Sequence, residues 1–229
     1  MKSIKAIVWD LDGTLIHFKI DYLRARHVAI KILKKYGVPK NLLTVRYSIL
    51  ENVSSARDFF QKEGLSRERI NEIIAEVDKE IIEIEHEAAV NAVMINGIDQ
   101  VLKFAKSKDL KQAIFTFNTR KNARISLEKV SLLGFFELIV GRDNISNLKP
   151  HPDHLKFICN ELSVEPDEIV VIGDSDRDIE AAINVGAHSI ALNTTRSNFH
   201  QLETFKKANK IVELNEIPSE LIEAIEEFL

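Results

Sequence analysis

The sequence predicts an α/β protein in which helices cover both faces of a parallel sheet. After Asn96-Gly97, short apolar runs alternate with amphipathic helical stretches as far as the end of the chain. Strands that alternate with helices in this way are typical of parallel sheets. Residues 21–90, in contrast, contain almost no strand signal. We therefore expect an α/β core with an all-helical insert between its first strand and the rest.

The first strand of this core is expected over residues 4–9, an apolar run that ends at acidic residues and a glycine. The later strands are expected over residues 112–116, 138–140, 169–172, 189–192 and 211–212. The helices between them are expected over residues 98–108, 119–133, 152–162, 175–185 and about 199–207, with a last helix from residue 218. Gly134 and Gly186 are expected to end two of these helices as left-handed caps.

The insert is predicted to consist of four helical stretches, over residues 21–36, 42–50, 55–62 and 66–90. In the last of these, apolar residues recur every three or four positions, with glutamates on the opposite side. This pattern indicates an amphipathic helix with a solvated acidic face.

Composition and charge argue against several classes of function. The net charge is −4, which gives no electrostatic footprint for nucleic acid. No stretch approaches the length of a membrane span, and the N-terminal apolar run is too short for a secretion signal. The single cysteine, Cys159, cannot form an internal disulfide and is expected to pack in the core. We expect a cytoplasmic monomer or homodimer without nucleic-acid or membrane partners.

The residues suited to chemistry follow the predicted strands. Ligands of open parallel sheets bind outside the carboxyl ends of the strands. Four strand ends or following loops carry the segments Asp10-Leu11-Asp12-Gly13-Thr14, Thr116-Phe117-Asn118, Lys149-Pro150 and Gly173-Asp174-Ser175-Asp176-Arg177-Asp178. Carboxylates, one hydroxyl and one ammonium at the same edge suit a divalent cation and a phosphate group.

These segments give the chain a resemblance to a known family. DLDGT at 10–14, a strand ending in Thr116, LKPHP at 148–152 and GDSDRD at 173–178 occur in the order found in the haloacid dehalogenase (HAD) superfamily. The chain resembles in particular its phosphatases with a helical (C1) cap, of the phosphoglycolate phosphatase and β-phosphoglucomutase type. We therefore expect a Rossmann-like three-layer core of residues 1–16 and 93–229, and a helical cap of residues 17–92 that opens for exchange and closes to exclude water.

The resemblance implies roles for the acidic residues. Asp10 would be the nucleophile that forms an aspartyl phosphate. Asp12, which projects to the same side as Asp10 in an extended chain, would protonate the leaving oxygen and later take a proton from water. Mg²⁺ would be held by Asp10, the backbone carbonyl of Asp12 and Asp174. Asp178, one helical turn after Asp174, would be either a further metal ligand or a residue behind the ligands.

The resemblance also implies a phosphate site. Thr116 would donate its hydroxyl to the phosphate, the backbone N–H of Phe117 would add a donor, and Lys149 would offset the charge. Many relatives have a small polar residue directly after the threonine, whereas this chain has Phe117 there, with Asn118 next. The local shape of the site is therefore left open.

Residues of the insert have two interpretations. Arg24, His27, Lys31 and Lys34 form one helical stripe, which is either a solvated basic face or a site for a second anionic group of the substrate.

The expected reaction is Mg²⁺-dependent hydrolysis of a small phosphorylated metabolite. A phosphosugar mutase would share Asp10, Asp12 and Mg²⁺, and would return the phosphate to a sugar rather than to water. Phosphate release distinguishes the two enzymes. A binding or scaffold protein on the same fold is the non-enzymatic alternative, and turnover of a generic aryl phosphate would exclude it.

Overall fold

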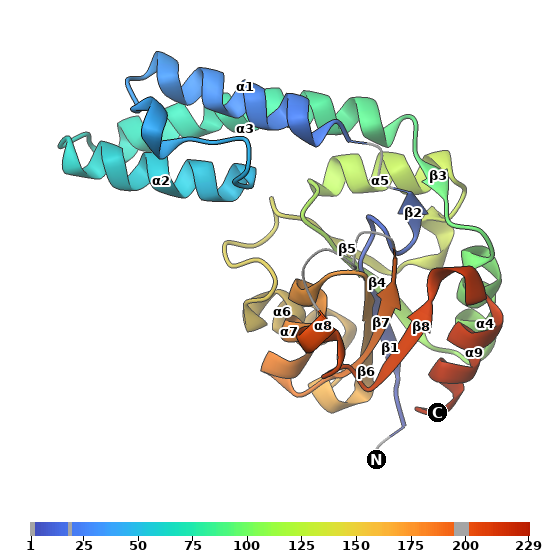
Figure 1. Cartoon of the computed structure of the whole chain (residues 1–229). Helices are drawn as coiled ribbons and strands as arrows, with labels where there is room; N and C mark the ends of the chain where they lie inside the picture. Colours follow the sequence, from blue (N-terminus) through green and yellow to red (C-terminus); the bar gives the residue numbers. More distant parts are fainter. Residues whose placement is uncertain (1–2, 18–19, 195–201) are drawn as a thin grey trace. The chain divides into compact units, whose positions relative to one another are not determined.

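The computed structural model describes residues 3–17, 20–194 and 202–229 (Figure 1). The chain divides into two compact units. Residues 1–18 and 89–229 form the first, called here the core unit, and residues 19–88 form the second, called the helical unit.

The core unit is built on a six-stranded sheet in which every neighbouring pair of strands is parallel. In spatial order the strands are β5 (Leu138–Val140), β4 (Lys111–Phe115), β1 (Ala6–Trp9), β6 (Ile169–Gly173), β7 (His188–Asn193) and β8 (Lys210–Glu213). Strand β1 lies at the centre, where Ala6 faces Lys111 on one side and Ile169 on the other. The carboxyl ends of β4, β1 and β6 therefore meet at one edge.

Alternate residues of each strand pack on opposite faces of this sheet. Ile7 and Trp9 of β1 face a hydrophobic cluster with helices α4 (Ile98–Ser107), α5 (Arg120–Lys129) and α9 (Ser219–Glu226). Ala6 and Val8 face a second cluster with α6 (Pro152–Leu162) and α7 (Asp176–Val185), which includes the buried Cys159. Figure 1 shows the sheet between these helices. The predicted three-layer α/β fold and the core position of Cys159 are confirmed.

Shorter elements complete the core unit. Strands β2 (Ile16–His17) and β3 (Val93–Met94) form an antiparallel pair on either side of the helical insertion. The sequence does not predict this pair because two residues are too few to show alternation. Helix α8 (Leu202–Phe205) lies within the segment predicted as helix over about 199–207, of which residues 199–201 lie outside the described residues. The 3₁₀ turns are η2 (Leu133–Phe135), η3 (Pro166–Glu168) and η5 (Leu214–Glu216).

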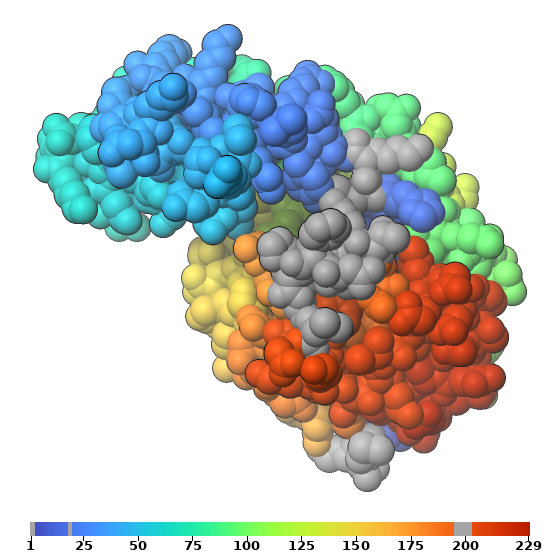
Figure 2. All heavy atoms as spheres, viewed as in Figure 1, coloured from blue at the N-terminus to red at the C-terminus, as the bar shows by residue number. Residues whose placement is uncertain are grey.

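The helical unit contains α1 (Tyr22–Lys35), the 3₁₀ turn η1 (Lys40–Leu42), α2 (Ile49–Lys62) and α3 (Arg67–Ala89). The three α-helices share one hydrophobic cluster, and Figure 2 shows residues 20–80 as a continuous body of blue to green atoms. The predicted helical insert is confirmed. In the described part of the chain, no helix combines the length and apolar character needed to cross a membrane.

Two local predictions are wrong. The helix expected over 42–50 does not form, because the buried Asn52 side chain bonds the backbone of Thr44, Tyr47 and Ser48 and holds residues 44–48 as a loop, and Ile49 and Leu50 instead begin α2. Helix α5 ends at Lys129, where Ser131 takes the left-handed conformation with φ of 60°, so Gly134 is not its cap. Gly186, with φ of 78°, does end α7 as predicted.

Candidate active site

Asp10 follows the last residue of the central strand and is 5% exposed. Its backbone N–H donates to the carbonyl of Ile172 at 2.9 Å, which extends the pairing of β1 with β6. The loop that follows turns at Gly13, whose φ is 97°. A β-carbon at Gly13 would lie 2.1 Å from an oxygen of Asp174. Glycine therefore allows the loop after β1 to pack directly against the carboxylate that follows β6.

Lys149 joins three parts of the core unit through its buried ammonium group. Nζ donates to Asp10 Oδ1 at 2.5 Å, to Asp178 Oδ1 at 2.6 Å and to the carbonyl of Phe115 at 3.2 Å. An ammonium has three N–H donors, so these contacts use all of them. Lys149 also lies 4.2 Å from the ring centroid of Phe115, a distance at which the ring attracts a cation.

The pKa values of this group follow from burial and charge. Burial raises the pKa of Asp10 to about 6, with Lys149 opposing the rise and the carboxylate of Asp178 adding to it. Burial alone would lower the pKa of Lys149, but Asp10 and Asp178 together outweigh it and raise the pKa. Lys149 is therefore charged, and the protonation of Asp10 is sensitive to what binds beside it.

A group of three buried carboxylates could hold a metal ion. Oxygens of Asp10, Asp174 and Asp178 all lie within 4.8 Å of one another. Buried carboxylates of this kind need a compensating cation, and oxygen ligands suit a hard divalent ion. Asp178 is already engaged, because its Oδ2 accepts from the backbone N–H of Ser175 at 2.9 Å and from its hydroxyl at 2.6 Å. The residues present thus fit a divalent metal site.

Asp12 lies beside the end of strand β4. Its Oδ2 accepts from Asn118 Nδ2 at 2.5 Å and, at the long distance of 3.5 Å, from Thr116 Oγ1. The backbone N–H of Asn118 donates to Thr116 Oγ1 at 3.1 Å. Residues that follow β1 and β4 thus form one hydrogen-bonded group that positions the Asp12 carboxylate.

Phe117 has an environment that the sequence left open. Its carbonyl accepts from Arg142 Nη1 at 2.7 Å. Its partly buried ring lies with the centroid 5.2 Å from Lys149 Nζ and 5.3 Å from the guanidinium carbon of Arg177. The ring therefore contacts two cations.

The structure thus brings together the predicted residues of the core unit: Asp10, Asp12, Thr116, Phe117, Lys149, Asp174 and Asp178. The sequence prediction gave no role to Asn118, Arg177 or Thr194, whose Oγ1 lies 3.4 Å from Asp174 Oδ2. Asn118 could have been noticed, because in an extended chain it projects to the same side as Thr116.

The basic stripe of α1 lies in the helical unit, and its members Arg24, His27, Lys31 and Lys34 are exposed. Arg24 makes a bidentate contact with Glu87, at 2.6 and 3.0 Å. Its charge is therefore already paired within the helical unit, which favours the interpretation of a solvated face for this residue.

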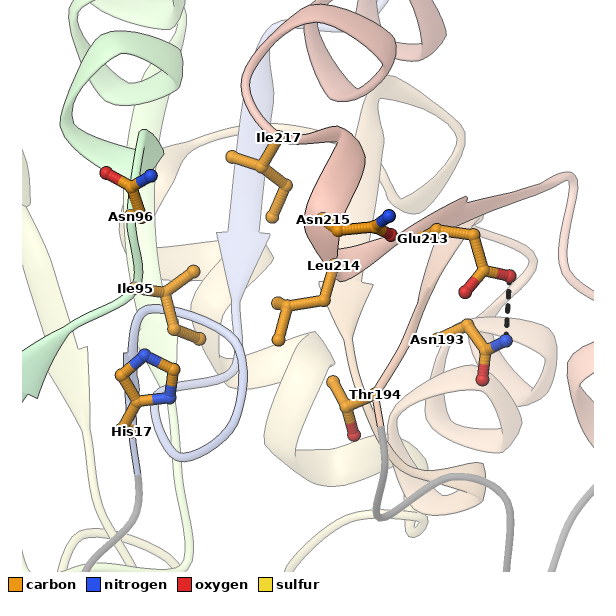
Figure 3. A pocket seen from close by; sticks show the side chains of 9 residues that line it. All are labelled: His17, Ile95, Asn96, Asn193, Thr194, Glu213, Leu214, Asn215 and Ile217. Atoms are coloured by element: carbon orange, nitrogen blue, oxygen red, sulfur yellow. Dashed lines mark hydrogen bonds between the residues drawn. The ribbon is translucent and has the colours of Figure 1, made fainter.

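A cavity of about 540 Å³ opens in the core unit beside the ends of β7 and β8 (Figure 3). Figure 3 shows the aliphatic side chains of Ile95 and Leu214 facing each other across it, and Asn193 bonded to Glu213 at 2.7 Å. Thr194 lines it and connects it to Asp174. Neither Asp10 nor Lys149 lines this cavity, so it borders the carboxylate cluster only through the contact of Thr194 with Asp174.

Comparisons with known proteins agree with this geometry. The family model of haloacid dehalogenase-like hydrolases matches residues 7–192. A phosphorylated carbohydrates phosphatase of Thermotoga maritima is 28% identical over 198 residues, which cover 82% of this chain and 84% of that protein. The pyrophosphatase PpaX of Bacillus anthracis is 25% identical over 209 residues, covering 89% of this chain and 90% of its own.

Solved structures share the fold. A β-phosphoglucomutase from Clostridium difficile superimposes with a TM-score of 0.67 at 22% identity, covering 98% of this chain and 97% of its own. A predicted phosphoglycolate phosphatase from Haemophilus somnus gives 0.64 at 20% identity, covering 96% and 99%. With the family match over most of its length, an Asp-based site at the sheet edge and phosphatases as relatives, the chain belongs to the haloacid dehalogenase-like hydrolases.

Proposed function

We propose that this protein is a Mg²⁺-dependent phosphatase of small phosphorylated metabolites that works through an aspartyl phosphate on Asp10. The observation that carries the proposal is the position of the buried Asp10 at the end of the central strand. Its Oδ1 lies 2.5 Å from Lys149 Nζ, and its carboxylate belongs to the same cluster as that of Asp174. A carboxylate in this position can attack phosphorus, and Lys149 offsets the charge that gathers there.

Asp12 would provide the proton transfers. It would protonate the leaving oxygen while Asp10 attacks, and then take a proton from the water that hydrolyses the aspartyl phosphate. The contacts from Asn118 and Thr116 fix the direction of its carboxylate. Thr116 and the backbone N–H of Phe117 would hold the phosphate.

Mg²⁺ would be held by Asp10, Asp174 and the backbone carbonyl of Asp12. When bound, it would neutralise part of the negative charge that an approaching phosphate meets. Asp178 would not be a ligand in this arrangement, because Lys149 and Ser175 already occupy its oxygens. It would instead hold Lys149 in place.

The two units would have different roles. Residues 1–16 and 93–229 would carry the chemistry, and residues 17–92 would act as the cap that controls access. A small phosphorylated substrate agrees with the names of the relatives, which act on phosphorylated carbohydrates and on pyrophosphate.

The test is phosphate release from a panel of phosphorylated metabolites, with Mg²⁺ or with EDTA. We expect release that requires Mg²⁺ and is lost in Asp10→Asn. Asp99→Asn is the matched control, because Asp99 pairs with Lys103 on the surface of α4, away from the site. Isomerised sugar phosphate without release would instead support the mutase, and release that survives Asp10→Asn would contradict the proposed nucleophile.

A further inference from the structure

We propose that Arg177 and Phe117 form a subsite for a second anionic group on the substrate, so that the preferred substrates are phosphate compounds carrying a further phosphoryl or carboxylate group. This inference rests on the proposed phosphatase function and concerns the part of the substrate that does not react.

The charges already in the site leave none over for a second anion. Asp10, Asp174 and Asp178 bring three negative charges, which Lys149 and one bound divalent metal ion would balance, and Asp12 as the proposed acid is protonated when the substrate binds. A second anionic group on the substrate therefore needs a cation of its own. Because all three donors of Lys149 are used by protein acceptors, that cation must come from another residue.

Arg177 has the properties of such a cation. It is partly buried and comes from the first turn of α7, three residues after Asp174 and next to Asp178. Within the described part of the chain, no carboxylate pairs with its guanidinium. A cation in the first turn of a helix opposes the helix dipole, so helix stability does not explain this arginine. The guanidinium group can bind a carboxylate or phosphate with two parallel hydrogen bonds.

Phe117 explains how the guanidinium is held. Phe117 belongs to none of the hydrophobic clusters formed by the described residues. Its ring instead contacts Lys149 and Arg177, at 5.2 and 5.3 Å. An aromatic face attracts a guanidinium without using its N–H donors. The ring thus restrains Arg177 beside the phosphate site and leaves its donors available to a ligand.

The position of Phe117 along the chain supports the same conclusion. It directly follows Thr116, and the proposed function gives the phosphate a contact with each of these two residues. A phosphoryl group bound there would bring the rest of a small substrate next to the ring and the arginine. A diphosphate, or a phosphate ester of a short hydroxy acid, would place its second anion at this point.

The experiment compares substrates that differ only in the second anion. The pairs are 2-phosphoglycolate with 2-hydroxyethyl phosphate, and ethylene glycol bisphosphate with 2-hydroxyethyl phosphate, so that every compound loses an alkoxide. In the wild type we expect kcat/KM to favour the two-anion member of at least one pair by about tenfold to a hundredfold, the value of one charge-assisted contact. Arg177→Gln should abolish this preference, and Phe117→Leu should reduce it. Arg124→Gln should leave it unchanged, because Arg124 pairs with Glu128 on exposed α5.

A binding measurement separates this inference from the phosphatase proposal. Calorimetry with Asp10→Asn and Mg²⁺ should give tighter binding of the two-anion compound in the same pair, and addition of Arg177→Gln should remove the difference. If no compound is hydrolysed by the wild type but this Arg177-dependent difference persists, the phosphatase proposal fails and the subsite stands. Equal binding within both pairs, or an equal loss for both members after Arg177→Gln, would overturn the subsite.

Discussion

Asn118 Nδ2 lies 2.5 Å from Asp12 Oδ2, although the two residues are 106 positions apart in the chain. The amide holds the proposed acid at the end of β4 in one direction. Its effect on catalysis should therefore depend on how much the leaving group needs a proton.

The first prediction concerns Asn118→Ala. Loss of the contact should lower kcat for alkyl phosphates by about tenfold, since their leaving oxygens must be protonated. Dinitrophenyl phosphate, whose leaving group departs as an anion, should lose no more than about twofold. Steady-state kinetics on both substrates measure the difference. Asn160→Ala, at an exposed position of α6, is the control, and equal losses on the two substrates would argue against a positioning role.

The second prediction concerns Gly13→Ala. The added methyl group would meet Asp174 at 2.1 Å and would stand at a residue with φ of 97°. We expect kcat to fall by about two orders of magnitude, because the loop after β1 must move away from Asp174, a proposed metal ligand. Gly186→Ala has a similar strain, with φ of 78°, but meets nothing within 4 Å. It should cost about 1 kcal/mol in unfolding free energy and leave kcat unchanged; a similar loss of activity in both variants would refute the steric explanation.

The third prediction concerns metal removal. Mg²⁺ that binds only the folded protein should raise Tm by about 5–10 °C at a concentration about one hundred times its Kd, and EDTA should reverse the rise. Asp174→Asn should greatly reduce this shift because one buried ligand is lost. Differential scanning calorimetry measures the shift, and Asp99→Asn should retain it. An undiminished shift in Asp174→Asn would place the bound ion elsewhere.

The fourth prediction concerns the pH dependence of stability through His154. This buried histidine lies edge-on to the Phe115 ring, and its Nε2 lies 3.2 Å from the carbonyl of Val140. Burial and, to a smaller extent, Lys149 lower its pKa from 6.5 to about 4. Between these values the unfolded chain binds the proton and the folded protein does not. The contribution of neutral His154 to the free energy of unfolding is therefore fully present above pH 6.5. It is lost as the pH falls towards 4, by about 3 kcal/mol in all.

Urea unfolding of the wild type and His154→Phe at pH 7.5 and pH 4.5 tests this linkage. The difference between the two proteins should shift in favour of the variant at the lower pH, because phenylalanine has no proton to bind. Titration of Asp10 affects both proteins alike and cancels in the comparison. A difference that does not change with pH would mean that His154 is not held neutral.

The strands, and the placement of most candidate site residues at one edge of the sheet, could be predicted because their signals are local. Apolar runs such as Ile169–Gly173 are buried on both faces, and the carboxylates at their ends stand out from the run. The parallel arrangement of the strands then places Asp10 and Asp174 at one edge of the sheet, so their proximity can be predicted before any side-chain contact is known. The order of these motifs along the chain was therefore sufficient to indicate the site.

What could not be predicted depends on contacts between distant residues or on a single side chain. The loop over 44–48 was predicted as helix because its composition allows one, and the bonds made by Asn52 decide against it. The end of α5 depends on Ser131 adopting a conformation that serine rarely takes. The contact of Asn118 with Asp12 and the pairing of Arg177 with Phe117 appear only after the sheet has been assembled.

The central place of β1 has a consequence for protein synthesis. Asp10 leaves the ribosome before β4 and β6, its neighbours in the sheet, which are made only after the 70 residues of the helical unit. Asp10 gains Lys149 only after the 139 following positions have been translated. Nascent and truncated chains therefore contain the proposed nucleophile without the residues that surround it in the folded protein, and we expect them to be inert toward the phosphorylated metabolites around them.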